Sequence, residues 1–375
     1  MRPHLCHIFP AFSAGGPEVR TCLLINATAG EFKHTVVSLS GELDGRERVC
    51  PGYEVDFVAV PRAARRIAHP FALARLLKAL RPDLVLTYGW GGTDGVLAAR
   101  LSGMRRVIHA EDGFLPDEAH RQKLLRLLAR RLVLRAPACV VCPSKSLVGI
   151  ARRHWFLPAR KVRYLPNGVD GHRFAPPTRQ VAEEARRRLG FAAGEVVIGT
   201  VGHLRAEKNQ ARLIRAFAAV AARREAKLLV AGAGPLREQL AALALELGVR
   251  DRVVFSGLMT DPVPCYHTID IFALSSDTEQ MPLALLEAMS VGLPIVSTDV
   301  GDVRTMVSAP NRRCVVPPAD EQEYAQELDC LAADGKERSF LGRSNREKCL
   351  REYGMPVMVD AYRSLYREVL NSERG

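Results

Sequence analysis

Apolar residues along this chain follow two alternating patterns, one typical of buried strands and one typical of helices. Segments such as PEVRTCLLINAT and HPFALARLLKAL repeat apolar residues at helical spacing. Short runs rich in Val, Ile and Leu separate them and fit strands covered on both faces. In the first half these runs are HLCHIF, HTVVSL, EVDFVAV, DLVLTY, RRVIHA, ACVVCP and VRYLP. Such alternation predicts parallel sheets with helices on both faces.

The same alternation starts again in the second half of the chain. Its strand candidates are EVVIGTVG, AKLLVAGAG, RVVFSG, DIFALSS, PIVST and CVVPP. The proline-rich segment FAPPTRQ (174–180) precedes a new helix and is the best linker candidate. A chain of 375 residues also exceeds one ordinary hydrophobic core. We therefore predict two doubly wound, Rossmann-like domains, 1–175 and 176–354, that face a central cleft holding the ligand site.

Composition predicts a soluble globular protein without a membrane span. Hydrophobic residues make up 47% and charged residues 25% of the chain, and no apolar run reaches the roughly 18 residues that span a bilayer. The first residues read as a strand and not as a signal peptide, and the nine scattered cysteines suggest reduced thiols, so we expect a cytoplasmic location. Cys139 and Cys142 lie three apart on a strand and point to opposite faces, which favours core packing over metal or redox chemistry. We expect no metal site.

Positive charge is concentrated in the first half of the chain. Residues 1–175 carry a net charge of +13, and residues 176–375 carry −1. This asymmetry implies an anionic partner, which could be a membrane surface, a phosphorylated substrate or nucleic acid. No motif that reads nucleic acid accompanies the charge, so nucleic acid is not expected. Residues 121–135 alternate leucines with basic residues and contain no acid, which fits either a solvated helix face or a helix lying on anionic lipid.

The stretch SDTEQMPLALLEAMSVG predicts a strand-to-helix loop suited to a phosphorylated ligand. Pro282 fits the first helical position, and Gly292 ends the helix. The free N–H groups at such a helix start bind anions, phosphate in particular. Glu287, inside the helix, could accept two hydrogen bonds from a vicinal diol such as a ribose, and Glu279, on the loop, could reach hydroxyls beyond the phosphates. Alternatively, the two are a helix-dipole glutamate and a surface glutamate.

This stretch resembles the Glu-x7-Glu motif of the retaining GT-B glycosyltransferases of family 4. The matching positions are Glu279, Pro282, Glu287, Ala288, Met289, Gly292, Pro294, Ile295, Val296, Ser297 and Thr298. Gln280 and Met281 replace the usual Gly and aromatic or Leu, and GDVR (301–304) replaces a Gly-Gly turn. The resemblance implies a nucleoside diphosphate sugar as the co-substrate. The residues that it implies as contacts of this donor are Glu279, Gln280, Met281, Pro282, Leu283 and Glu287.

Two further segments of the second half resemble the same family. VGHLRAEKNQARLIRAF is similar to its VGRLxxEKG segment, which implies that Arg205 and Lys208 bind the donor diphosphate; His203 stands where the family usually has Arg. Two fixed cations could stabilise the leaving diphosphate, a task that other enzymes give to a metal. RVVFSGLM (252–259) lies where the family forms part of its nucleobase pocket, which implies Gly257 and Leu258 as contacts.

The first half matches the family at the ends of two predicted strands. Gly15 and Gly16 correspond to the Gly-Gly loop that borders the donor phosphates and the acceptor. His109 corresponds to the histidine beside the reacting sugar, and Glu111 and Asp112 are candidates for acceptor hydroxyls. The final helix, within 355–375, resembles the family's last helix, which packs back onto the first domain.

Together these matches predict a retaining glycosyltransferase that moves a sugar to a hydroxyl of a glycan or lipid-linked glycan, in cell-surface polysaccharide biosynthesis. Its expected catalytic residues are His109, Glu279, Arg205 and Lys208. No cofactor is expected besides the nucleotide sugar, and a peripheral position on the inner face of the cell membrane is an option. Two alternatives stay open: a GT-B nucleotide-sugar epimerase, and a catalytically idle partner that binds nucleotide sugar in a glycan assembly complex.

Overall fold

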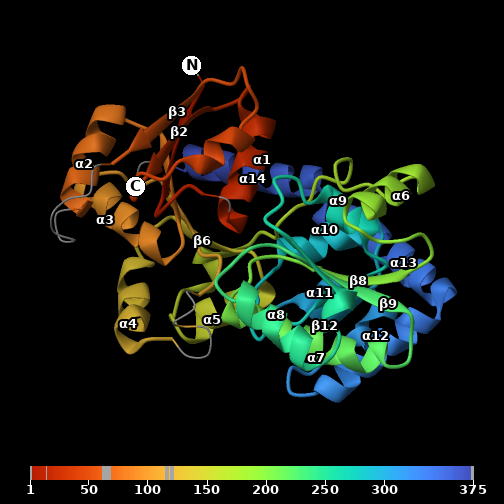
Figure 1. Ribbon diagram of the computed structural model, residues 1–375. Helices are drawn as coiled ribbons and strands as arrows, with labels where there is room; N and C mark the ends of the chain where they lie inside the picture. Colours follow the sequence, from red (N-terminus) through yellow and green to blue (C-terminus); the bar gives the residue numbers. More distant parts are fainter. Residues whose placement is uncertain (1, 14, 61–68, 115–117, 119–121, 373–375) are drawn as a thin grey trace. The chain divides into compact units, whose positions relative to one another are not determined.

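The chain folds into two compact units in the computed structural model (Figure 1), which describes residues 2–13, 15–60, 69–114, 118 and 122–372. The first unit comprises Met1–Asn167 and Pro356–Gly375, and the second comprises Gly168–Met355. Each unit is built on one parallel sheet with helices on both of its faces, which confirms the predicted doubly wound α/β class.

The first unit has a seven-stranded sheet in the order β3-β2-β1-β4-β5-β6-β7, with every pair parallel. Its strands are β1 His4–Phe9, β2 Lys33–Ser38, β3 Val55–Ala59, β4 Leu84–Tyr88, β5 Val107–Ala110, β6 Cys139–Cys142 and β7 Val162–Tyr164. Its helices are α1 Gly16–Thr28, α2 His69–Leu80, α3 Thr93–Leu101, α4 Leu124–Val133, α5 Lys145–Arg153 and α14 Met355–Asn371, of which α14 begins on the last residue of the second unit.

The second unit has a six-stranded sheet in the order β10-β9-β8-β11-β12-β13, again wholly parallel. Its strands are β8 Val196–Val201, β9 Ala226–Ala231, β10 Val253–Gly257, β11 Ile271–Leu274, β12 Ile295–Thr298 and β13 Val315–Val316. Its helices are α6 Arg179–Arg188, α7 Gln210–Ala221, α8 Arg237–Glu246, α9 Val263–Thr268, α10 Leu283–Val291, α11 Val303–Met306, α12 Glu321–Ala333 and α13 Gly335–Tyr353.

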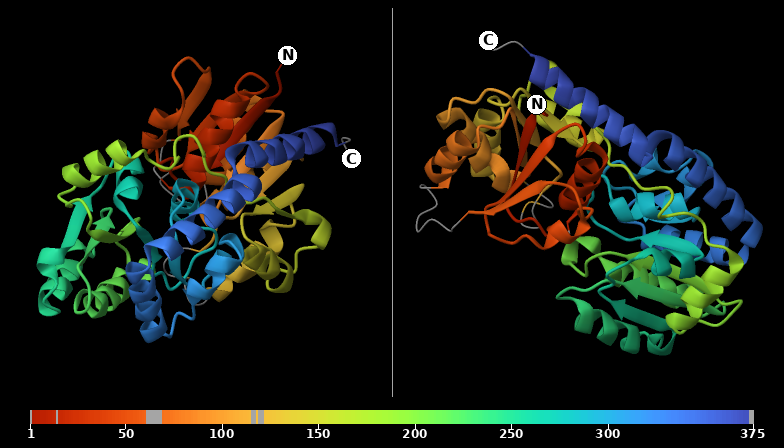
Figure 2. Two further views of the ribbon diagram at one scale, coloured as in Figure 1. Left: turned by 90° about the vertical axis from the view of Figure 1, so that its right-hand side faces the viewer. Right: turned by 90° about the horizontal axis from the view of Figure 1, so that it is seen from above.

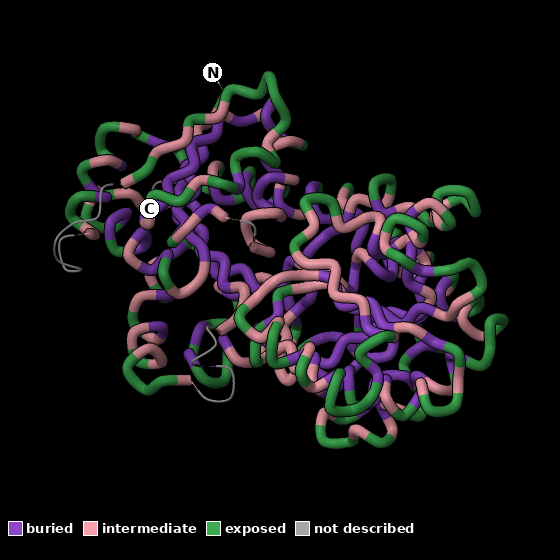
Figure 3. The backbone as a smooth tube through the Cα atoms, viewed as in Figure 1, coloured by how far each residue is buried: buried purple, intermediate pink, exposed green. Residues whose placement is uncertain are grey.

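The central strands of both sheets are buried on both faces (Figure 3), as expected for parallel sheets covered by helices. In the second unit two apolar clusters form, one around Phe272 and Leu285 and one around Leu213 and Val230. Cys139 and Cys142 are buried in β6, and burial raises the pKa of the Cys139 thiol to about 12. Their interpretation as core residues is confirmed.

The strand order of each sheet reverses once, which fixes where a ligand site can form. The reversal falls between β1 and β4 in the first unit and between β8 and β11 in the second. In open parallel sheets the crevice for ligands lies beyond the carboxyl ends of the strands at this point. The loops that follow β8 and β11 are therefore the structurally favoured site in the second unit.

The first unit ends at Asn167, eight residues before the boundary predicted at 175. The segment after it joins the second unit, because Val169 pairs with the end of α13. The Val169 N–H donates to the Tyr353 carbonyl over 2.9 Å, and the Met355 N–H donates to the Val169 carbonyl over 2.8 Å. Phe174, five residues on, is buried in the core of the second unit. The proline-rich segment at 174–180 is thus internal to that unit.

The last helix, α14, belongs to the first unit for most of its length (Figure 2). Tyr366 packs edge-on against Phe32, with ring centroids 6.0 Å apart. Arg363 on the same helix pairs with Glu31 over 2.8 Å. Within the described residues, no helix combines the length and the apolar character that crossing a membrane requires.

Candidate active site

The loops that follow β8 and β11 meet through side chains distant in sequence. Lys208 donates to the Oε1 atom of Glu279 over 2.5 Å, although the two residues lie 71 positions apart. The Ser276 hydroxyl donates to the same Glu279 oxygen over 2.8 Å. The structure therefore brings together the cation predicted for the donor diphosphate and the carboxylate predicted for the sugar.

Backbone and side-chain bonds lock the two loops into one unit. Asn209, with a φ of +43°, caps α7 by accepting from the Arg212 N–H over 3.2 Å. Its amide nitrogen donates to both carboxylate oxygens of Asp277 over 3.1 Å. The Ser275 hydroxyl donates to the Lys208 carbonyl over 3.0 Å. Lys208 is thus presented from a rigid turn, Ala206–Lys208, at the strand-order reversal.

Arg205 precedes this turn, and its side chain is exposed. His203, two residues earlier, is exposed too, and its pKa is lowered by partial burial and by the charges of Arg205 and Lys208. A neutral imidazole therefore replaces the arginine usual at this position of the family segment. The positive charge shown next to Glu279 is that of Lys208, to which Glu279 is paired.

The loop 279–282 lies close against a glycine in the following turn. Gly301 has a φ of +57°, and a Cβ there would lie 2.4 Å from the Glu279 carbonyl and 2.7 Å from the Gln280 carbonyl. The Asp302 N–H donates to the Gln280 carbonyl over 3.1 Å. Met281 turns inward and is only 5% exposed. Met281 therefore offers a ligand its backbone and not its side chain.

Helix α10 begins one residue later than the sequence predicts. Pro282 has a φ of −68° and a ψ of 124°, so its backbone is still extended and it is the N-cap of the helix. The first helical residue is Leu283. The N–H groups of Leu283 and of the residues just after it therefore point toward the N-terminal end of the helix. Gly292, with a φ of +91°, ends the helix as predicted.

Glu287 lies on α10 and is held by a tyrosine that the sequence did not single out. The hydroxyl of Tyr266, on α9, donates to the Oε2 atom of Glu287 over 2.6 Å. Tyr266 is fully buried, and burial together with the charge of Glu287 raises its pKa well above the ordinary value. A lone tyrosine in VPCYHTID carries no sequence signal that separates this contact from ordinary packing.

A small cavity of about 120 Å³ opens at the carboxyl ends of β8, β9 and β10. Leu258, predicted for the nucleobase pocket, lines it and is 76% exposed. Gly257 flanks the cavity and accepts from the Gly232 N–H over 3.0 Å. The lining residues are Val201, Gly202, His203, Ala231, Gly232, Ala233, Leu258, Met259, Pro262 and Cys265. The cavity is mostly apolar, and its lining residue His203 lies two positions before Arg205.

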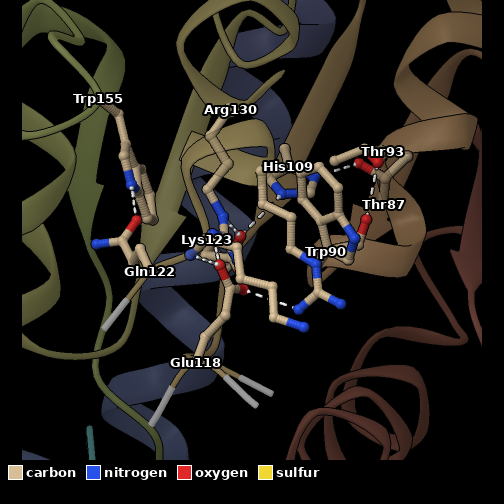
Figure 4. Close-up of polar contacts among 11 residues, drawn as sticks. Thr87, Trp90, Thr93, His109, Glu118, Gln122, Lys123, Arg130 and Trp155 are labelled. Atoms are coloured by element: carbon tan, nitrogen blue, oxygen red, sulfur yellow. Dashed lines mark hydrogen bonds and ion pairs between the residues drawn. The ribbon is translucent and has the colours of Figure 1, made fainter. Parts of the chain in front are cut away.

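In the first unit, His109 (Figure 4) is the penultimate residue of β5, close to the strand end as predicted, and it is fully buried. Its Nδ1 atom lies 2.8 Å from the Thr87 hydroxyl. Its Nε2 atom has no hydrogen-bond partner among the described residues and lies 3.9 Å from Oε2 of Glu111. The imidazole is therefore oriented by Thr87 from one side and faces a buried carboxylate on the other.

Arg130 of α4 is buried in this cluster, whereas the sequence placed it on a basic surface face (Figure 4). It donates to both oxygens of Glu118, over 3.2 and 3.1 Å, and to Glu111 over 3.4 Å. Three aromatic rings surround its guanidinium at 5.0–5.5 Å, those of Trp90, Phe114 and Trp155. Arg130 is therefore stabilised in the interior by two buried acids and three aromatic rings. Arg121, also part of the predicted basic face, lies outside the described residues.

Asp112, predicted for acceptor hydroxyls, is paired with Arg20 of α1. Both carboxylate oxygens accept from the Arg20 guanidinium, one of them over 2.9 Å. Arg20 also donates to Asn167 over 2.9 Å. Gly15, the N-cap of α1, leaves room for Glu18, since a Cβ would lie 2.4 Å from a Glu18 oxygen. Burial raises the pKa of Glu18 to about 7.

Two solved glycosyltransferase structures share this fold. A glycosyltransferase from Rickettsia africae aligns with a TM-score of 0.83 at 13% identity, covering 99% of this chain and 100% of that one. HepE from Anabaena, solved with UDP and glucose, aligns with a TM-score of 0.84 at 17% identity, covering 98% of this chain and 100% of its own. The two parallel-sheet units therefore define a GT-B fold.

Sequence comparisons assign the family. The family of glycosyl transferases group 1 matches residues 181–348, and the glycosyl transferase 4-like domain matches residues 15–168. A GDP-mannose-dependent alpha-(1-6)-phosphatidylinositol monomannoside mannosyltransferase of Mycobacterium tuberculosis is 30% identical over 277 residues, 69% of this chain and 70% of its own length. A galactosyltransferase of Escherichia coli that acts on GlcNAc-diphosphoundecaprenol is 25% identical over 307 residues, 80% and 79% of the two chains. The chain belongs to the group 1 glycosyltransferases, as the Glu-x7-Glu resemblance predicts.

Proposed function

We propose that the protein is a retaining, metal-independent glycosyltransferase that moves a sugar from a nucleoside diphosphate sugar to a hydroxyl of a glycan or lipid-linked glycan. The observation that carries the proposal is the meeting of Lys208, Glu279 and Ser276 beside the start of α10. Cation, carboxylate and free helix N–H groups are the partners that a phosphorylated sugar needs.

The proposed donor site runs along the strand-order reversal of the second unit. Lys208 and Arg205 bind the diphosphate, and the N–H groups at the start of α10 bind its terminal phosphate. Glu287 binds the ribose diol. Glu279 binds hydroxyls of the sugar, and Leu258 borders the base in the small cavity.

The same groups supply the electrostatics of the reaction. Negative charge develops on the leaving diphosphate as the glycosidic bond breaks, and two fixed cations at a helix start stabilise it without a metal. In the first unit, His109 is assigned to the reacting sugar, with Gly15 and Gly16 bordering the phosphates and Glu111 and Asp112 serving the acceptor. Retention of configuration follows the family pattern of the Glu-x7-Glu motif.

Two relatives support a lipid-linked acceptor in cell-surface polysaccharide biosynthesis. The names of the Escherichia coli and Mycobacterium tuberculosis enzymes state a diphosphoundecaprenol and a phosphatidylinositol acceptor, respectively. Both acceptors are anchored in a membrane. A cytoplasmic enzyme with such an acceptor has to work at the membrane surface.

The exposed face of α4 supports a peripheral membrane position. Leu125 and Leu132 are 81% and 73% exposed, and Leu124 and Leu128 share their face of the helix. Phe156 is also exposed and lies under Arg131, 4.4 Å from the guanidinium to the ring centroid. Exposed apolar side chains with the partly exposed Arg131 beside them fit the headgroup region of an anionic bilayer.

A binding screen followed by a transfer assay tests the proposed function. Purified protein is screened by thermal shift against UDP-, GDP- and ADP-sugars, and the stabilising sugar is then offered with a lipid-linked acceptor. We expect a new glycosidic product whose anomeric configuration matches that of the donor. An altered sugar formed without acceptor would instead identify an epimerase. A Glu287→Ala variant that sustains glycan synthesis in cells lacking the native protein would identify an idle binding partner.

A further inference from the structure

Tyr266 and Glu287 form a contact in the candidate donor site that no motif accounts for. The Tyr266 hydroxyl donates to Oε2 of Glu287 over 2.6 Å, a length typical of a hydroxyl bonded to a charged carboxylate. A carboxylate has about four acceptor positions on its two oxygens. Glu287 can therefore keep the tyrosine and still accept hydrogen bonds from a ligand diol.

The ring of Tyr266 is fixed by aromatic neighbours on two sides. Phe174 meets it edge-on, with centroids 5.7 Å apart and planes at 83°. Phe272 of β11 lies at 6.0 Å and 31°. The tyrosine is fully buried, so its hydroxyl has little freedom to leave Glu287. The direction of the carboxylate is set by a rigid donor and not by solvent.

The same segment that packs on Tyr266 also holds helix α10. Ser290, one turn after Glu287, donates its hydroxyl to the Phe174 carbonyl over 2.9 Å. Arg346 of α13 donates to the Ser290 carbonyl. Phe174 thus contacts the tyrosine with its ring and the helix with its carbonyl. Glu287 is fixed through its backbone and its side chain by one closed set of contacts.

We propose that Tyr266 is a positioning residue for nucleotide binding, which holds the Glu287 carboxylate in the orientation that accepts the 2′- and 3′-hydroxyls of the donor ribose. The inference rests on the proposed function, because it takes Glu287 as the ribose ligand. It adds a residue from α9 to the site, and it gives a function to the buried hydroxyl of Tyr266 next to Glu287. A purely structural tyrosine would stabilise the fold without favouring one nucleotide over another.

A ligand lacking the two ribose hydroxyls separates positioning from folding. Binding of UDP, GDP and ADP and of their 2′,3′-dideoxy forms is measured by calorimetry on the full-length wild type and on Tyr266→Phe. For the nucleotide that binds, we expect the wild type to prefer the ribose form about tenfold or more. In Tyr266→Phe this preference should fall to about twofold, with unchanged affinity for the dideoxy form.

Tyr324 supplies a matched control in the same unit. It is fully buried on α12, and its hydroxyl has no hydrogen-bond partner among the described residues. Tyr324→Phe therefore removes one buried hydroxyl without touching Glu287, and the preference for ribose should stay at the wild-type value. Glu287→Gln should lose the preference as Tyr266→Phe does.

Each other outcome has a distinct meaning. A Tyr266→Phe variant that keeps the wild-type preference, or that loses affinity for both nucleotide forms equally, would overturn the positioning role. A wild type that binds a nucleotide without preferring ribose would remove Glu287 as the diol ligand and the inference with it. A wild type that binds none of the nucleotides would refute the proposed function itself.

Discussion

Arg130 and Glu118 make two hydrogen bonds, of 3.2 and 3.1 Å, with neither side chain exposed to solvent. A charged pair can be buried at this depth only if nearly every donor and acceptor is used. Here Arg126 and the Lys123 N–H also donate to Glu118. The basic helix α4 is therefore anchored by its charges and exposes its leucines, the reverse of an ordinary surface helix.

Replacing Arg130 by methionine should strongly destabilise the first unit. The change roughly keeps the side-chain length but leaves Glu111 and Glu118 without their buried cation, which costs about 3–5 kcal/mol. Urea unfolding followed by tryptophan fluorescence measures this loss, because Trp155 and Trp90 both line the cluster. Arg126→Met is the matched control, since that side chain is 22% exposed, and it should cost less than about 1 kcal/mol. Equal losses in the two variants would contradict the anchoring role.

The stability of the first unit should fall as the pH drops below about 6.5. Nε2 of His7 lies 3.0 Å from Nδ1 of His34. Burial, together with the charge of the other histidines, lowers the pKa of His7 well below its ordinary value and that of His34 to about 4. The unfolded chain then binds more protons than the folded one, so stability is complete above pH 6.5 and is lost toward pH 4.

At pH 5, His34 alone should account for about 2 kcal/mol of lost stability, since one pKa unit corresponds to 1.36 kcal/mol. Unfolding free energies at pH 7.5 and 5 measure the effect. His34→Gln should reduce the difference between the two pH values. His154→Gln should leave the difference unchanged, because His154 caps the end of α5 and has no part in the buried pair. A wild type equally stable at both pH values would exclude the mechanism.

Lys208→Ala should lower kcat/KM for sugar transfer about 100- to 1,000-fold, because it removes a fixed charge beside the leaving phosphate. The same change also leaves Glu279 without its cation. The transfer assay with the donor selected by the screen measures the loss. Lys227→Ala is the control, as this lysine of β9 pairs with Glu195 over 2.8 Å and has no part in the candidate site. Wild-type transfer by Lys208→Ala would argue against the assigned role.

Leu125→Asp combined with Leu132→Asp should weaken binding to anionic vesicles about tenfold or more. Both leucines lie on the exposed face of α4, and a charge there repels anionic lipid and removes apolar contact. Co-sedimentation with vesicles of phosphatidylglycerol and phosphatidylcholine, at low and high salt, measures the change. Leu245→Asp, on a leucine of α8 in the second unit that is 69% exposed, should bind as the wild type does. A wild type that ignores anionic vesicles would disprove the membrane proposal.

The alternation of apolar runs was enough to predict two parallel α/β units, because a strand buried on both faces and an amphipathic helix differ in period. Local rules also placed the end of α10 at Gly292, where a left-handed φ is required. The boundary between the two units was harder to predict from the sequence. Val169 belongs to the second unit because it pairs with Tyr353. The two residues lie at opposite ends of that unit in the sequence, so no local sequence pattern indicates their contact.

The features of the site that the sequence missed all depend on partners far away in the chain. From the sequence, Arg130 is interpreted as a solvated arginine. In the structure it is surrounded by Glu111, Glu118 and three aromatic rings. Phe156 lacks any motif, and only the fold places it next to Arg131. Tyr266 reads as a core aromatic, and its hydroxyl gains a role only through Glu287, 21 positions later.

The paired backbone bonds of Val169 with Tyr353 and Met355 mean that the chain enters and leaves the second unit at a single place. In topological terms, that unit is an insertion between Asn167 and Pro356 of the first. Insertions whose two ends lie side by side can be exchanged without changing the path of the host chain. Residues 168–355 thus form a natural cassette, and if the proposed donor site is correct, its replacement by the corresponding segment of a relative would change the donor preference of the same first unit.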